Sequence, residues 1–190
     1  MDQIILSDKV FENLDPAKDP LVVGEYEACT FINCDCGNAN LSASRFLDCE
    51  FRRCNLSMAQ LRGTSLRKVS FVGCKLLGLR FDTCNEFGLS VSFDTCTLDH
   101  SSFFRTKLKK TSFMASQLHD VDFSECDLTG ATFEKCDLLR TAFHNTNLEK
   151  ADFRTAFNYS IDPEMNRMKK AKFSLVGVAG LLEKYQVDIF

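Results

Sequence analysis

Residues 123–153 read FSECD LTGAT FEKCD LLRTA FHNTN LEKAD F, so a large apolar residue returns at every fifth position. Outward from this stretch, Phe and Leu alternate at the same spacing without interruption from Phe93 to Phe153. The step also runs through the first half of the chain, from Tyr26 to Phe81. An α-helix repeats about every 3.6 residues and a strand about every 2, so neither buries every fifth residue. The chain is therefore an array of five-residue units.

The position two residues before each large residue is also regular. In the second half of the chain it holds only Val, Cys, Ser, Thr or Ala, so each unit has one large inward residue, one small inward residue and three outward residues. Two units, CDLTG at 126–130 and ADFRT at 151–155, match the consensus A(D/N)LXX of the pentapeptide-repeat family, which the chain resembles over about residues 24–156. The resemblance implies an all-β fold, a right-handed quadrilateral β-helix with four units per coil.

Such a coil predicts that residues twenty apart stack, provided that two extra residues are allowed near 84–90. The first face then carries Phe31, Phe51, Phe71, Phe93, Phe113, Phe133 and Phe153. The second face carries Cys36, Leu56, Leu76, Leu98, Leu118 and Leu138. The third carries Leu41, Leu61, Phe81, Phe103, Phe123 and Phe143, and the fourth carries Tyr26, Phe46, Leu66, Leu108, Leu128 and Leu148. Ring stacking along the first face would add to simple burial.

Three segments are expected along the chain. Residues 1–23 form an N-terminal cap, in which Val10, Phe11 and Leu14 precede Pro16 and Pro20. Residues 24–156 form the β-helix with a small bulge near 84–90, and residues 157–190 form a C-terminal cap and dimerisation module. Because coils stack at about 4.8 Å, some six coils give a rod roughly 30 Å long. A rod this slender is not expected to hold an internal pocket.

The C-terminal segment breaks the repeat after Ala156. Asp162-Pro163-Glu164 predicts the start of one helix, Ser174 predicts the cap of a second, and the last residues predict a short strand. The final coil can cover only one side of a short helix, so an apolar patch would stay exposed. We expect this patch to be a homodimer interface formed by Leu181, Leu182, Tyr185, Val187, Ile189 and Phe190.

Composition bounds the class of protein. The net charge is −3, no apolar run is long enough to span a membrane, and the N-terminus lacks a basic start, so a cytoplasmic location is expected. Nine of the ten cysteines occupy the small inward position, and Cys36 occupies a large one. Metal or redox chemistry is one interpretation of so many thiols. We expect buried, free thiols instead, because Cys34-Asp35-Cys36 lacks zinc-finger spacing.

Histidine offers the remaining route to catalysis. Stacking predicts Asp99 opposite His119 and His100 opposite Asp120 on the second face. These pairs could form a weak metal or acid–base site, or two surface contacts worth about a few tenths of a kcal/mol each. We expect surface contacts, since no glycine-rich phosphate loop or zinc-protease motif is present. The prediction is a protein that is not an enzyme, with no catalytic residue, cofactor or metal.

Outward charges separate by face. The second face shows a candidate partner-binding surface of Asp35, Asp99, Asp120 and Asp137. The opposite, fourth face shows Arg45, Arg67, Lys68, Lys107, Lys109 and Lys110, mixed with Asp48 and Asp127. The pattern is typical of an ordinary solvated surface or of a rod with one acidic and one basic flank for electrostatic docking.

The chain is similar to the Qnr, MfpA and McbG type of topoisomerase-interacting pentapeptide-repeat proteins in length, in its unbroken repeats and in its ending. That resemblance implies a DNA-mimicking modulator or protector of DNA gyrase or topoisomerase IV, of the quinolone-resistance or toxin-immunity type. The partner would be a protein, with no direct nucleic-acid or membrane contact. The alternative is a generic protein–protein interaction scaffold. This alternative stays open because the bulge has only two extra residues and the net charge is small.

Overall fold

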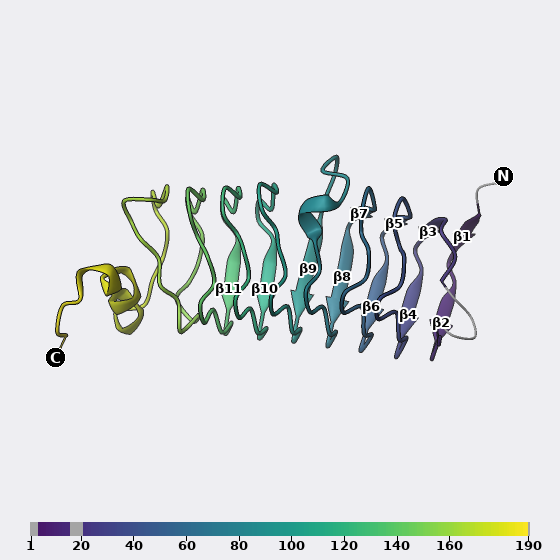
Figure 1. The fold of residues 1–190 in the computed structure, drawn as a ribbon, viewed down its shortest axis with the longest axis horizontal. Coiled ribbons are helices and arrows are strands. Elements are labelled where there is room, and N and C mark those ends of the chain that lie inside the picture. Colours follow the sequence, from purple (N-terminus) through teal and green to yellow (C-terminus); the bar gives the residue numbers. More distant parts are fainter. Residues whose placement is uncertain (1–3, 16–20, 190) are drawn as a thin grey trace.

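The computed structural model describes residues 4–15 and 21–189, which form a rod of stacked coils with the two ends of the chain at opposite ends of the rod (Figure 1). Short strands mark two sides of the first coils and one side of the later coils: β1 (Ile5–Ser7), β2 (Val10–Glu12), β3 (Glu25–Glu27), β4 (Thr30–Ile32), β5 (Arg45–Leu47), β6 (Glu50–Arg52), β7 (Ser65–Arg67), β8 (Val69–Val72), β9 (Val91–Asp94), β10 (Ser112–Met114) and β11 (Thr132–Glu134). Three short 3-10 helices complete the fold: η1 (Phe81–Thr83), η2 (Val176–Leu181) and η3 (Glu183–Tyr185). The predicted all-β quadrilateral β-helix is confirmed.

All strand pairing is parallel, and its register follows the predicted step of twenty. One sheet has the order β1-β3-β5-β7, and the other has the order β11-β10-β9-β8-β6-β4-β2. Phe51 pairs with Phe71, and single parallel bridges such as Asn55 to Lys75 continue the ladder on the other sides. Between β8 and β9 the partners are Val69 and Val91, so the register there is twenty-two. The two-residue insertion is thus confirmed.

The core is a set of ring columns along the rod axis. Successive phenylalanines of the first face stack with nearly parallel rings, for example Phe113 on Phe133 at 4.9 Å between centroids. Phe103 and Phe123 form a second such column on the third face, at 5.0 Å. Rings of the two columns meet edge to face, as Phe113 and Phe123 do at 5.6 Å. The phenylalanine rings of these two columns therefore make both favourable aromatic geometries.

Regular stacking is not confined to residues 24–156. β1 and β2, assigned to the N-terminal cap, pair in register with β3 and β4, and Phe11 stacks on Phe31 at 4.9 Å. At the other end, Lys172 bridges to Asp152, and Phe173 stacks on Phe153 at 5.3 Å. The ladder continues because these rings fall on the same step of twenty. Pro16 and Pro20 of the expected cap lie outside the described residues.

Two predictions for the C-terminal segment are wrong. Pro163–Met165 form a turn rather than a helix, and the Asp162 carboxylate accepts the Glu164 N–H at 2.8 Å within it. After Ser174 the chain forms the 3-10 helices η2 and η3, although Ser174 Oγ does accept the Gly177 N–H at 3.0 Å. The sequence VGVAGL of η2 contains two glycines, each costing about 1 kcal/mol in an α-helix.

The predicted terminal strand is absent from the described residues. Val187 and Ile189 belong to no strand, and Phe190 lies outside the part that the structure describes. Instead, η2 and η3 lie beyond the last coil and close that end of the rod (Figure 1, yellow). None of the described helices is long and apolar enough to cross a membrane.

The cysteines provide a first testable prediction. Nine of the ten thiols are buried, and Cys84 beside the insertion is half-buried. Burial raises the pKa of Cys36 to about 12 and that of Cys136 to about 11, so few thiolates exist at neutral pH. Burial raises the pKa of Cys84 to about 12 as well. In thiol titration of the native protein at neutral pH, all ten thiols are therefore expected to react slowly, with Cys84 first because it is the most accessible, and all ten should react after denaturation. Native reactivity should rise with pH as the raised pKa values are approached.

Cys84→Ser should remove the first-reacting thiol without changing the other nine. Several fast-reacting thiols in the native Cys84→Ser protein, or fewer than ten thiols in the unaltered chain after denaturation without reductant, would contradict this account.

Candidate partner-binding surface

The second face owes its side-chain columns to the corners of the coil. Residues two positions after each large residue have a left-handed backbone, with φ of 60° at His100, 55° at Asp120 and 56° at Arg140. This conformation costs a non-glycine residue roughly 1–2 kcal/mol. A ladder hydrogen bond offsets the cost, as when the Asp120 N–H donates to the Leu139 carbonyl at 3.0 Å. The corners therefore stack His100, Asp120 and Arg140 in one outward column.

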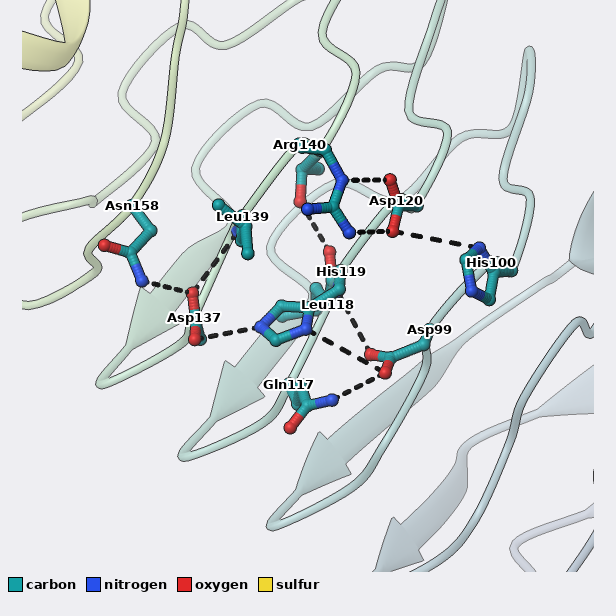
Figure 2. Close-up of polar contacts among 11 residues, drawn as sticks. Asp99, His100, Gln117, Leu118, His119, Asp120, Asp137, Leu139, Arg140 and Asn158 are labelled. Carbon is teal, nitrogen blue, oxygen red and sulfur yellow. Dashed lines mark hydrogen bonds and ion pairs between the residues drawn. The ribbon is translucent and has the colours of Figure 1, made fainter.

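Within this column, Arg140 is the main partner of Asp120. The guanidinium of Arg140 donates two hydrogen bonds to the Asp120 carboxylate, at 2.6 and 2.7 Å (Figure 2). His100 Nδ1 lies 3.9 Å from the same carboxylate. The hydrogen bonds from Arg140 hold the pKa of Asp120 below its usual value, so this group is ionised at neutral pH. The predicted pairing of His100 with Asp120 is confirmed, with Arg140 as the stronger partner.

A second column places His119 between two carboxylates. Its Nε2 lies 2.9 Å from Oδ2 of Asp137, and its Nδ1 lies 4.0 Å from Oδ2 of Asp99 (Figure 2). Asp99 also accepts the His119 backbone N–H at 3.1 Å and the Gln117 side-chain amide at 2.5 Å. The predicted contact of Asp99 with His119 is confirmed. The sequence did not predict the contact of His119 with Asp137, because these two residues occupy different outward positions of their five-residue units.

Asp137 is the most constrained of these carboxylates. Its Oδ1 accepts the Asn158 side-chain amide at 2.8 Å and the Leu139 N–H at 3.3 Å. Partial burial alone would raise the pKa of Asp137, but the contacts from His119 and Asn158 outweigh it and hold the pKa below its usual value. Asp137 is thus a fixed negative charge on this face.

Asp35 lies apart from the other three predicted residues. It occupies the same outward position as Asp137, but Asn55, Lys75, Thr97 and Gln117 stand between them in the column of bridges. Five steps of about 4.8 Å separate the two carboxylates by roughly 24 Å. Asp35 accepts hydrogen bonds from the Asn55 amide at 2.9 Å and from the Gly37 N–H at 3.0 Å. The structure therefore brings together Asp99, Asp120 and Asp137 only.

The chemistry of this cluster is that of a surface network. Each of the three carboxylates already accepts hydrogen bonds or an ion pair from a neighbouring side chain. Within residues 4–15 and 21–189, no group of three or more His, Cys, Asp or Glu side chains is placed to hold a metal ion. What the cluster offers a partner is negative charge at fixed positions, modulated by His119 and Arg140.

The C-terminal module carries a second exposed surface, of apolar character. Leu175 is 92% exposed and Val176 89% exposed, although sequence reasoning placed neither in the expected dimer interface. Of the residues that it did place there, Tyr185, Val187 and Ile189 are exposed, Leu181 and Leu182 are half-buried, and Phe190 lies outside the described residues.

One cationic side chain, Lys184, contributes polar contacts that hold the module on the rod. Lys184 Nζ lies 2.7 Å from a carboxylate oxygen of Asp162 and 2.7 Å from one of Glu164. Tyr185 also donates its hydroxyl to Glu164 at 2.7 Å. The hydrogen bond from Lys184 is the main reason that the pKa values of Asp162 and Glu164 are lowered. These contacts tie η3 to the turn that precedes the last coil.

This tie predicts a pH dependence of module docking. Carboxyl groups with lowered folded pKa values stabilise the docked state above their unfolded pKa values of about 4, and this stabilisation is lost as pH falls through the folded values. Hydrogen exchange of the η2 and η3 amides should therefore accelerate as the pH falls below roughly 4. This acceleration should occur at a higher pH than that at which the amides of the core begin to exchange faster. Lys184→Met should remove this acid dependence. An acid dependence that persists unchanged in Lys184→Met would exclude the tie as its cause.

Comparison with known proteins agrees with the geometry. A model described as pentapeptide repeat region matches residues 89–153, and a model of pentapeptide repeats in eight copies matches residues 29–67 and 49–85. Together they cover more than half of the chain, which belongs to the pentapeptide-repeat family. No curated protein matches the sequence.

Solved structures of QnrB1, a plasmid-mediated fluoroquinolone resistance protein, have a similar fold. One trypsin-treated variant superposes with a TM-score of 0.59 at 16% identity, over 100% of both chains. Another gives a TM-score of 0.58 at 16% identity, over 99% of this chain and 98% of that chain. The similarity extends over the whole rod and its C-terminal end, and at this identity it concerns the fold.

Proposed function

We propose that this chain is a non-enzymatic binding protein and that its partner is a type II DNA topoisomerase, either DNA gyrase or topoisomerase IV. The observation that carries the proposal is the end-to-end match of the fold with QnrB1, a fluoroquinolone resistance protein. Fluoroquinolones act on type II topoisomerases, so a protein of this shape that confers resistance has a direct reason to contact the enzyme. The proposed site of action is the cytoplasm.

The proposed contact is made by the second face. Asp99, Asp120 and Asp137 present carboxylates at positions fixed by the coil, which is how a rigid rod can occupy a surface built for the phosphates of a duplex. Because backbone and side chains are already ordered, little conformational entropy is lost on docking. The rod thus acts as a local mimic of duplex DNA rather than as a charge-matched copy along its whole length.

The active form is proposed to be a homodimer joined at the C-terminal module. Leu175, which precedes η2, Val176 of η2 and Tyr185 of η3 leave an apolar surface at the end of the rod that a second copy would cover. An isologous contact there doubles the length of the rod. A longer rod reaches across more of a DNA-binding surface than one chain can.

A scaffold for a different protein is the second candidate, and one observation favours it. Arg140 compensates the Asp120 carboxylate, His119 contacts that of Asp137, and the chain carries a net charge of only −3. Duplex DNA carries one charge per about 1.7 Å, far more than this rod presents. On this second candidate, the outer residues recognise a partner whose charge pattern is mixed.

The two candidates are separated by the activity of purified DNA gyrase. Under the first, the protein should change the rate of supercoiling, and it should restore supercoiling that a quinolone has inhibited. Asp99→Asn with Asp137→Asn should weaken the effect, whereas Asp48→Asn on the fourth face should not. Unchanged supercoiling in both conditions, at protein concentrations well above that of gyrase, would reject the topoisomerase proposal and favour the scaffold.

A further inference from the structure

We propose that the fourth face carries a second docking surface, built around Phe87, for an acidic segment of a protein partner whose carboxylates alternate with apolar side chains. The surface, called here the Phe87 patch, consists of Phe87, Arg67, Lys68, Lys107, Lys109 and Lys110. It lies opposite the carboxylates of the second face, and it does not depend on a topoisomerase as partner.

Phe87 belongs to the loop between η1 and β9, and this loop rises above the row of described coils (Figure 1, teal). Its side chain is 73% exposed, whereas the phenylalanines of the ring columns are buried. A large aromatic side chain exposed to this extent loses the hydrophobic contribution that burial would give it. Aromatic residues of this kind are typical anchors of protein interfaces.

The loop holds Phe87 in place rather than leaving it free. The Asn85 N–H donates to the Thr64 carbonyl and the Ser90 N–H donates to the Leu66 carbonyl, both at 2.9 Å, so each end of the loop is tied to the neighbouring coil. Between them, the Asn85 side chain accepts the Phe87 N–H at 2.9 Å. A side chain presented by an ordered loop binds with a smaller entropic penalty than one on a disordered segment.

Arg67 supports the ring from below. Its guanidinium carbon lies 5.0 Å from the centroid of Phe87, within the range of a cation–π contact. The loop can approach this closely because residue 88 is glycine: a Cβ there would lie 3.1 Å from Arg67 Nε. Arg67 Nε is buried and makes no hydrogen bond with any residue that the structure describes. Arg67 thus supports the exposed position of Phe87. The positive charge of Arg67 has no carboxylate partner among those residues.

The surroundings of Phe87 carry a surplus of positive charge. Lys68 contacts Asp48 at 3.3 Å, Lys107 contacts Glu86 at 3.9 Å, and Lys109 contacts Asp127 at 3.2 Å. Arg67 and Lys110 make no ion pair within the described residues. The patch therefore has five cations against three carboxylates, and its aromatic anchor stands among the cations. A protein segment that alternates apolar side chains with Asp and Glu is the complement of this arrangement.

A nucleic acid fits the patch less well than an acidic protein does. Single-stranded nucleic acids bind to several aromatic side chains in succession, and Phe87 is a lone exposed aromatic in this patch. The carboxylates of Asp48, Glu86 and Asp127 lie among the lysines and would face the phosphates. A protein surface can place its own charges between them, so charge complementarity selects the protein partner.

Fluorescence anisotropy with three labelled probes tests the proposal on the full-length chain. The probes are a peptide that alternates Asp or Glu with Leu or Ile, the same peptide with Lys at every acidic position, and an oligo-dT strand. The acidic peptide should bind, should bind more weakly as salt rises, and should lose at least about tenfold in affinity with Phe87→Ser. Lys109→Glu with Lys110→Glu should weaken it as well, and the basic peptide should not bind.

Met58→Ser is the matched control, because Met58 is also a large exposed apolar side chain, at 59% exposure, but occupies a corner of the second face. Its affinity for the acidic peptide should equal that of the unaltered chain, and circular dichroism should confirm that all variants keep the β-helix. The proposal fails if the acidic peptide does not bind, if Phe87→Ser and Met58→Ser behave alike, or if oligo-dT binds more tightly than the peptide.

Discussion

Phe113→Ala is expected to lower the free energy of unfolding by about 3–5 kcal/mol, a large part of the stability of a domain of this size. Phe113 is 0% exposed, and its ring stacks on Phe93 at 5.1 Å and on Phe133 at 4.9 Å. It also meets Phe103 and Phe123 edge to face. Truncation leaves a cavity between coils whose spacing is fixed by the β-ladder, so neighbouring rings cannot collapse into it.

Urea unfolding followed by circular dichroism measures this loss. Met114→Ala is the matched control, because Met114 is the next residue of β10 but points outward and is 37% exposed. Its effect should stay within about 0.5 kcal/mol, as is usual for surface substitutions. Equal destabilisation by the two variants would mean that the column of rings is not the core of the fold.

Gly180→Ala is expected to detach the C-terminal module from the rod and to abolish the proposed homodimer. A Cβ at residue 180 would overlap the backbone carbonyl oxygen of Tyr159 and would lie 2.9 Å from its ring carbon Cδ2. Backbone atoms cannot turn aside as a flexible side chain can, so η2 itself must shift. The Ile161 N–H would then lose its bond to the Gly180 carbonyl, now 2.9 Å long.

Light scattering at tens of micromolar protein should give the mass of a dimer for the full-length chain and of a monomer for Gly180→Ala. Ala179→Ser, an exposed neighbour in η2, should remain dimeric. A monomeric full-length chain would contradict the dimer outright. A dimeric Gly180→Ala protein would place the interface elsewhere on the rod.

The repeat made most of the fold predictable from sequence. Because each fifth residue must enter the same narrow core, the alternation of Phe and Leu is enough to predict which residues stack, and the shift from Val69 to Val91 follows from counting. The contacts of Asp99 with His119 and of His100 with Asp120 were predictable for the same reason, since they join equivalent positions of neighbouring coils.

Features that depend on contacts outside the repeat were not predictable. The approach of His119 to Asp137 depends on how far two different outward columns lean toward each other. The exposure of Leu175 depends on how the chain enters the 3-10 helix η2, whose Gly177 and Gly180 lie close to Tyr159. Phe87 had a weak signal, because an aromatic residue inside an insertion has no place in the core.

Competition between this protein and duplex DNA for gyrase tests the proposed function most directly. A labelled duplex bound to purified gyrase is titrated with the unlabelled chain, and the fraction of duplex that remains bound is followed by anisotropy. If the second face occupies the surface that binds DNA, the chain should displace the duplex completely, and Asp99→Asn with Asp137→Asn should require a higher concentration to do so. A duplex that stays fully bound at saturating concentrations of the dimeric chain would contradict the account.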